Sequence, residues 1–372
     1  MEPSDLESLE GQELALLREE QPEEADPSPE PVSYSGTDFD VEGLVRRLGR
    51  GDIIIPNFGI ADDSLETAGF QRSFVWRRPQ MDRFIESLLL GYPVPGIMLV
   101  QQNDRRYLVL DGQQRLRTLA FFYSGVHDKV EFALKNVASQ FKDLTYASLP
   151  AELKRTLDNT FLQATIVKTD GRPASLEAVY QIFERLNSGG TQLTPHEIRV
   201  ALYAGPFIEY LTKLNELGSW RELYGVRSPR LRDQELVLRV VALYVSPGDY
   251  SRPLKKYLND FTARHRYMAN LPSDLVMERF DQAAKLLAAA VGRRALRPSG
   301  GAVNAALTEA ILVGLARRLD MGPEPTVAQV RDAVDQIREN SDLGIAISRA
   351  TADEESVRTR LTITTRAFAT TL

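Results

Sequence analysis

The apolar and polar positions of the chain divide it into a mixed first half and a helical second half. Short apolar runs that end at turn residues predict β-strands over residues 52–56, 97–102, 105–110 and 161–168. The two middle runs flank a polar pair and predict a β-hairpin. Apolar residues at helical spacing predict helices over residues 41–48, 79–90, 113–123 and 175–186. Nearly every segment after about residue 206 also has a helical pattern. This order predicts an α+β domain followed by an all-helical domain.

One helix start is well marked in the sequence. Thr194 suits the N-cap, Pro195 suits the first helical position, and Glu197 lies three residues beyond the cap. This spacing predicts a capping box. The preceding stretch "NSGG", residues 187–190, predicts a helix C-cap, and the alternative interpretation is a backbone nest for phosphate.

Charge is distributed unevenly along the chain. Residues 1–38 carry twelve acidic residues and one basic residue, a net charge of −11, whereas the remainder carries 39 acidic and 44 basic residues, a net charge of +5. We therefore expect a disordered acidic arm over residues 1–38, an α+β domain over 39–205 and a helical domain over 206–372. The alternative interpretation of the arm is that it competes with nucleic acid for the basic surface of the body.

The composition limits the compartment and the chemistry. The chain has no cysteine, which excludes disulfides, thiolate metal ligands and cysteine nucleophiles and fits a reducing cytoplasm. Its first residues are acidic where a signal peptide would be basic, and its apolar runs are too short to span a membrane. We expect a soluble, cytoplasmic protein with no membrane partner.

A compact polar group, "DGQQR" at residues 111–115, lies where a predicted strand meets a predicted helix. The free N–H groups and the dipole of a helix start favour an anion, and Gly112 lets the backbone turn sharply. Arg115 could grip phosphate oxygens with two nitrogens, and Asp111 could cap the helix or hold Mg²⁺. The amides of Gln113 and Gln114 could orient a water molecule or read a base edge. Together these groups suit a triphosphate.

The same five residues also fit ordinary helix capping. Asp-Gly is common before a helix, and Gln and Arg are common in a first turn, so spacing alone favours this structural interpretation. The stretch is not a Walker A loop, because GK[ST] is absent, and it is not a Rossmann GxGxxG. A nucleotide site therefore needs support from other motifs.

Four motifs that occur in order give that support. They are "FQRSFVW", "LLLGYPVPGIMLV", "YLVLDGQQRLRTL" and "IFERLNSGGTQLTPHEIR". Together they resemble the N-terminal domain family of GmrSD-type restriction endonucleases over about residues 52–205. The resemblance implies a ParB/sulfiredoxin-like fold, Mg²⁺-dependent hydrolysis of nucleoside triphosphates and a role in sensing modified phage DNA.

The resemblance also assigns roles to residues of the polar group. It implies a nucleotide pocket lined by Asp111, Gly112, Gln113, Gln114 and Arg115. Within that pocket Arg115 would neutralise phosphate charge in the transition state, Gln114 would place the attacking water, and Asp111 would position Mg²⁺.

Other residues are expected near this pocket. The resemblance places Gln71 and Arg72 beside it, next to a surface that meets nucleic acid, and it makes Asn187 a further contributor. The chain departs from the family pattern near Gln71 and Arg72. Most members run from "IP" to "FQR" within a few residues, whereas here residues 57–69 intervene. The role of this insertion stays open.

A second departure concerns DNA cleavage. Many members carry a C-terminal HNH-type nuclease domain, which needs several histidines for metal binding and general-base work. This chain has three histidines, His127, His196 and His265, and they are widely separated in sequence. The sequence therefore predicts no self-contained HNH nuclease, so a separate nuclease subunit would cut the DNA.

The leading hypothesis is a Mg²⁺-dependent nucleoside triphosphate hydrolase that serves as sensor or motor subunit of a prokaryotic restriction system acting against phage DNA. The alternative is a DNA-binding module that nucleotide switches without hydrolysis. A homo-oligomer is compatible with either hypothesis. The sequence does not identify the nucleotide, the DNA modification or the partner.

Overall fold

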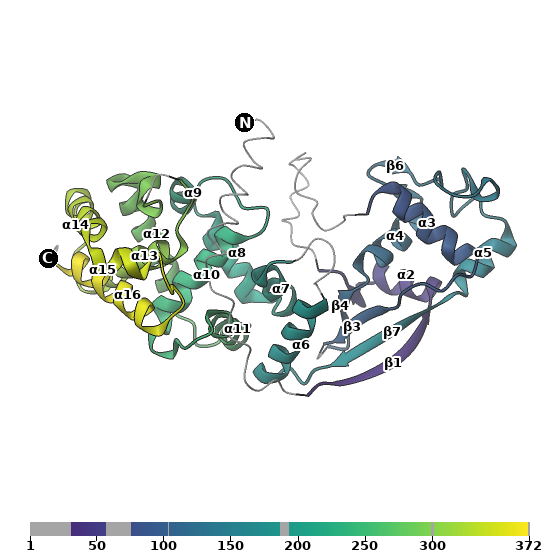
Figure 1. The fold of residues 1–372 in the computed structure, drawn as a ribbon, viewed down its shortest axis with the longest axis horizontal. Helices are drawn as coiled ribbons and strands as arrows, with labels where there is room; N and C mark the ends of the chain where they lie inside the picture. Colours follow the sequence, from purple (N-terminus) through teal and green to yellow (C-terminus); the bar gives the residue numbers. More distant parts are fainter. Residues whose placement is uncertain (1–30, 57–75, 103, 187–192, 299–300, 371–372) are drawn as a thin grey trace. The chain divides into compact units, whose positions relative to one another are not determined.

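The computed structural model describes residues 31–56, 76–102, 104–186, 193–298 and 301–370 (Figure 1). In this part the chain forms two compact units, which divide between Leu202 and Tyr203. The predicted domain boundary between residues 205 and 206 lies three residues from this division. The first unit mixes strands and helices and the second is helical throughout, so the α+β prediction is confirmed.

The first unit is built on a five-stranded mixed sheet in the described residues (Figure 1). The strand order is β1 (Ser33–Asp40), β7 (Phe161–Lys168), β3 (Ile97–Gln101), β4 (Tyr107–Asp111) and β2 (Ile53–Ile54). β3 and β4 run antiparallel, which confirms the predicted hairpin, and their register shifts between Met98 and Leu99. β3 is parallel to β7, and β2 is parallel to β4. Parallel neighbours need crossover connections, and helices provide them.

Four helices pack together with one face of this sheet in a single apolar core. They are α2 (Val41–Gly49), α3 (Arg78–Leu89), α4 (Gln113–Ser124) and α5 (Ala151–Asp158). Alternate strand residues such as Leu99, Val109 and Ala164 face the helices. Their neighbours Leu108 and Val167 are also buried, on the opposite face, where α6 (Pro173–Leu186) contacts β4. The sheet is thus covered on both sides.

α3 is fixed by a fully buried carboxylate. Asp82 Oδ1 accepts a hydrogen bond from Arg78 Nε at 2.8 Å. Its Oδ2 accepts from the backbone N–H groups of Lys135 and Asn136 and from the Asn136 side chain. A buried charge needs such partners. Asp82 therefore ties α3 to the segment that follows the small hairpin of β5 (Val126–His127) and β6 (Val130–Glu131).

Some local predictions hold in detail and others need correction. The capping box is confirmed: Thr194 Oγ1 accepts from the Glu197 N–H at 3.1 Å and the Glu197 carboxylate accepts from the Thr194 N–H, at the start of α7 (Pro195–Leu202). The pattern missed α5, β5, β6 and the 3₁₀ turn η1 (Ser139–Phe141).

The predicted acidic arm extends too far into the domain. Residues 1–30 lie outside the described residues, but residues 33–38 belong to β1, which pairs with β7 over eight residues. Phe39 at the end of this strand packs edge-on with Tyr107 at 6.3 Å. The polar composition of residues 33–38 gave no sign of this pairing, because an edge strand can be stabilised by backbone hydrogen bonds to a distant partner.

The second unit confirms the prediction of an all-helical region within the described residues. Its elements are α8 (Pro206–Glu216), α9 (Gly218–Tyr224), α10 (Arg232–Val245), η2 (Pro247–Asp249), α11 (Leu254–His265), α12 (Ser273–Ala290), η3 (Gly292–Leu296), α13 (Ala305–Asp320), α14 (Val327–Glu339), α15 (Ser341–Ala346) and α16 (Glu354–Ala369). α13 is buried on almost every side. A Cβ on its Gly314 would lie 2.8 Å from Thr364 of α16, so the two helices approach closely there.

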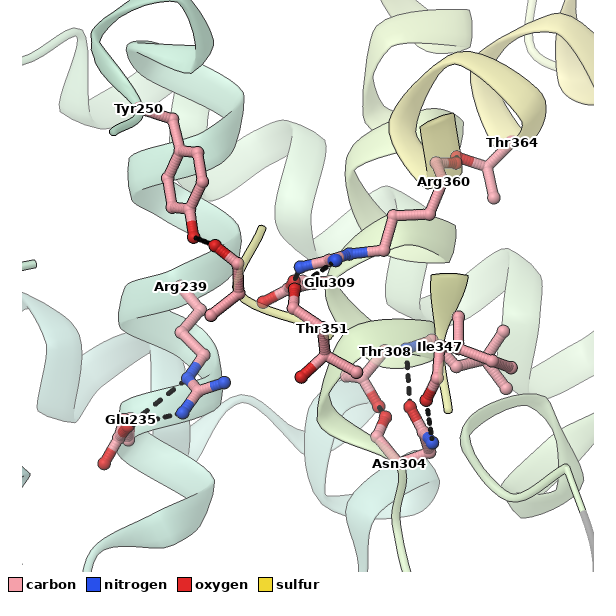
Figure 2. A network of polar contacts seen from close by, with 12 residues as sticks. Glu235, Arg239, Tyr250, Asn304, Thr308, Glu309, Ile347, Thr351, Arg360 and Thr364 are labelled. Atoms are coloured by element: carbon pink, nitrogen blue, oxygen red, sulfur yellow. Dashed lines mark hydrogen bonds and ion pairs between the residues drawn. The ribbon is translucent and has the colours of Figure 1, made fainter. Parts of the chain in front are cut away.

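A polar network lies inside this helical unit (Figure 2). Glu309 of α13 and Arg360 of α16 form an ion pair, and both side chains are almost completely buried. Arg360 Nη1 also donates to the Thr351 carbonyl at 2.5 Å. The Tyr250 hydroxyl donates to the carbonyl of Ala352. Burial, with Glu309 as a second cause, raises the pKa of Tyr250, which keeps this hydroxyl protonated as a donor. The network joins two helices to two loops.

Candidate functional site

The DGQQR stretch forms a sharp turn between β4 and α4. β4 ends at Asp111, α4 begins at Gln113, and Gly112 between them has a φ of 93°. A Cβ at Gly112 would lie 2.5 Å from Ile97 Cγ2 on the neighbouring strand. Glycine is required for two reasons, because other residues disfavour this backbone conformation and because the neighbouring strand leaves no room. The N-cap of α4 is Gly112, which has no side chain, so Asp111 does not take the capping role considered for it.

Gly112→Ala is expected to lower the free energy of unfolding by about 2–3 kcal/mol, from left-handed backbone strain together with the clash on Ile97. Urea denaturation measures the loss. Gly125→Ala is a matched control, because Gly125 ends the same helix with a φ of 75° and has open space around it. The control should lose about 1 kcal/mol from strain alone. Equal losses in the two variants would contradict the steric argument.

Arg115 holds the turn against two other segments. Its Nη2 donates to the Gly96 carbonyl and to Asp111 Oδ2, each at 2.8 Å. The side chain is 14% exposed, whereas that of Asp111 is 55% exposed, so the ion pair lies at the surface. Among the described residues, Nε and Nη1 of Arg115 make no hydrogen bond, and Nε is buried. The guanidinium is therefore positioned through Nη2, and Nη1 can donate to a further acceptor.

Gln114 connects the turn to the start of α3. Its Oε1 accepts a hydrogen bond from the Trp76 backbone N–H at 3.1 Å. Gln113, the first residue of α4, is half-buried. The structure thus brings together all five residues of the predicted group at one junction. Sequence analysis did not predict the bonds to the Trp76 N–H and the Gly96 carbonyl, because no local pattern indicates which distant backbone group a side chain will bind.

The donor set at the junction fits one kind of metal site. The described residues hold no group of three or more His, Cys, Asp or Glu side chains that could enclose a metal ion. Mg²⁺, however, commonly binds one or two carboxylates together with substrate phosphates and waters. Among the described residues, Asp111 Oδ1 makes no hydrogen bond, and the side chain is exposed enough to reach solvent. Asp111 is therefore suited to Mg²⁺ that is shared with a phosphate.

The remaining predicted site residues and the histidines lie away from this junction or outside the described residues. Gln71, Arg72 and Asn187 lie outside the described residues, as does the insertion at 57–69. The three histidines lie in β5, α7 and α11, which are separate elements. His196 is fully buried, and its Nδ1 lies 3.2 Å from Arg199 Nη1.

Comparison with known proteins identifies the first unit. Residues 50–204 match the model of the family described as GmrSD restriction endonuclease, N-terminal domain. No curated protein matches the chain. No helix among the described residues is long and apolar enough to cross a membrane. The matched family belongs to the context of DNA restriction and defence against phage. The resemblance drawn from the four motifs is thus confirmed: residues 50–204 match the family of GmrSD restriction endonuclease N-terminal domains.

Proposed function

We propose that this domain binds and hydrolyses a nucleoside triphosphate with Mg²⁺ and serves as the sensor or motor subunit of a restriction system that acts on foreign DNA. The observation that carries the proposal is the start of α4, where Gly112 is the N-cap and the Arg115 guanidinium lies beside the turn. The family match supports the restriction context. The N–H groups and the dipole of a helix start, next to a guanidinium, favour phosphate.

Each residue of the turn has a role in this proposal. The N–H groups of the first turn bind a phosphate, and Arg115 Nη1 meets phosphate oxygens while Nη2 stays on Gly96 and Asp111. Asp111 Oδ1 would hold Mg²⁺, which supplies charge neutralisation at the phosphates when bound. Gln113 orients the attacking water. The sequence analysis gave that role to Gln114, but its Oε1 is already bonded to Trp76.

The partners follow from the family context. Foreign DNA is the polyanion that the system recognises, and a separate nuclease subunit carries out cleavage. Gln71, Arg72 and Asn187 remain candidates for the nucleotide pocket and its DNA-facing side. We place the protein in the cytoplasm, where phage DNA and nucleoside triphosphates are both available.

The test is phosphate release by the full chain from ATP, GTP, CTP and UTP, with Mg²⁺ or EDTA and with or without phage DNA. We expect release from at least one nucleotide that depends on Mg²⁺ and changes when DNA is added. Nucleotide binding without release would favour the alternative, a DNA-binding module switched by nucleotide. Absence of both binding and release would contradict the proposal.

A further inference from the structure

The first turn of α4 is a meeting point for segments that are far apart in sequence. Arg115 binds the Gly96 carbonyl, which precedes β3, and the carboxylate of Asp111, which ends β4. Gln114 binds the Trp76 N–H, which precedes α3. A ligand bound to the N–H groups of this turn would therefore act on three hydrogen bonds: those of Arg115 to Gly96 and Asp111, and that of Gln114 to Trp76. The Gln114 bond is the one that connects the turn to α3.

Trp76 is held from two sides. Its backbone N–H bonds to Gln114, and its indole packs edge-on against Phe84 of α3, with ring centroids 5.5 Å apart. The next residue, Arg77, is the N-cap of α3, and its N–H donates to Gln80 Oε1 at 2.8 Å. Any displacement of Trp76 is thus passed directly to the start of this helix.

Gln114 itself is anchored in the turn. Its carbonyl oxygen accepts from Thr118 Oγ1, one turn later in α4, at 2.8 Å, and Thr118 is fully buried. Its backbone N–H belongs to the first turn, where the phosphate would bind. The same residue therefore contributes to the start of α4 through its backbone and to the entry of α3 through its side chain.

We propose that Gln114 is a positioning residue that couples nucleotide binding at α4 to Trp76 at the start of α3. This inference rests on the proposed function, because the coupling needs a nucleotide at the turn. A phosphate drawn to the first N–H groups shifts the turn relative to Trp76 and alters the 3.1 Å contact. Gln114 acts through Trp76 and does not itself meet the reacting atoms.

Tryptophan fluorescence of the full chain tests the coupling. The chain has two tryptophans, and Trp220 is buried in the helical unit with its Nε1 bonded to Asn215. Titration with MgATP, or with whichever nucleotide supports phosphate release, should change the emission. Trp76→Phe should remove that change, because it removes the indole but keeps an aromatic ring and the backbone N–H that bonds to Gln114. Equilibrium dialysis with labelled nucleotide measures binding separately.

Two Gln114 variants separate positioning from binding. Gln114→Met keeps the length of the side chain and removes the acceptor, so at saturating nucleotide the Trp76 signal should be lost and kcat should fall about tenfold. Its KM should stay within about threefold of the wild-type value. Gln114→Glu keeps an acceptor oxygen and should keep the Trp76 signal at saturation, although its charge raises KM.

The outcomes distinguish the two proposals. If wild type binds no nucleotide in dialysis, the proposed function fails and the coupling falls with it. If wild type and Gln114→Met bind nucleotide and give the same emission change and kcat, the coupling is wrong while the proposed function stands. Urea midpoints of both variants, taken without nucleotide, confirm that the comparison is between folded proteins.

Discussion

Replacing Arg360 with methionine is expected to lower the free energy of unfolding of the helical unit by about 3–5 kcal/mol. The substitution leaves the carboxylate of Glu309, which has 0% exposure, without its cationic partner. Among the described residues, Glu309 Oε2 also has no hydrogen-bond partner, so the carboxylate loses its only side-chain hydrogen bond in this part of the chain. The Thr351 carbonyl also loses its donor. Chemical denaturation followed by far-ultraviolet circular dichroism measures the change.

The double variant separates the ion pair from the packing. Glu309→Leu combined with Arg360→Met replaces both charges with apolar side chains of comparable size, and such replacements are often neutral or stabilising. We therefore expect the double variant to recover most of the loss, with a large coupling energy in the double-mutant cycle. A loss below about 1 kcal/mol for Arg360→Met alone would show that the buried charge is compensated in another way.

Replacing Arg115 with alanine should reduce the kcat for phosphate release by about 10²–10³-fold, the usual effect of removing a positioned electrostatic donor from a transition state. The side chain is mostly buried and already oriented by Gly96 and Asp111, so the guanidinium needs little reorganisation when charge develops on the phosphate. Steady-state phosphate release with saturating Mg²⁺ and nucleotide measures the effect.

Two further variants make this result interpretable. Arg115→Lys keeps the charge but lacks the second terminal nitrogen, so it should recover only part of the activity. Arg117→Ala removes the same charge from the same helix, two residues later and about 200° around its axis, and should leave kcat within about threefold of wild type. Equal losses for Arg115→Ala and Arg117→Ala would indicate a general loss of folded protein, and full activity of Arg115→Ala would contradict the assigned role.

Local sequence patterns predicted the elements that carry the site. The apolar run of β4, the glycine at 112 and the spacing of Leu116 and Leu119 were enough to place a strand, a turn and a helix. The capping box at Thr194 was predicted in the same way. These features depend on residues within a few positions of one another, and backbone conformation and side-chain sterics determine them locally.

The partners of the site residues could not be predicted. Arg115 was expected to face a phosphate, and the structure places its Nη2 between Gly96 and Asp111. Gln114 was expected to hold a water, and its Oε1 holds the Trp76 N–H. Arg and Gln side chains can bond to many acceptors and donors, and the choice among them depends on which segments the fold brings within about 3 Å.

The sequence alone determined the strand, turn and helix that carry the DGQQR stretch, the glycine at the β4–α4 turn and the family match of residues 50–204. Tertiary structure decided the inclusion of residues 33–38 in the sheet, the burial of Glu309 with Arg360, and the link from Gln114 to Trp76. The first group follows from short-range sterics and apolar periodicity. The second depends on contacts between residues 38 to more than 100 positions apart, which form only when the sheet and the helix core are assembled.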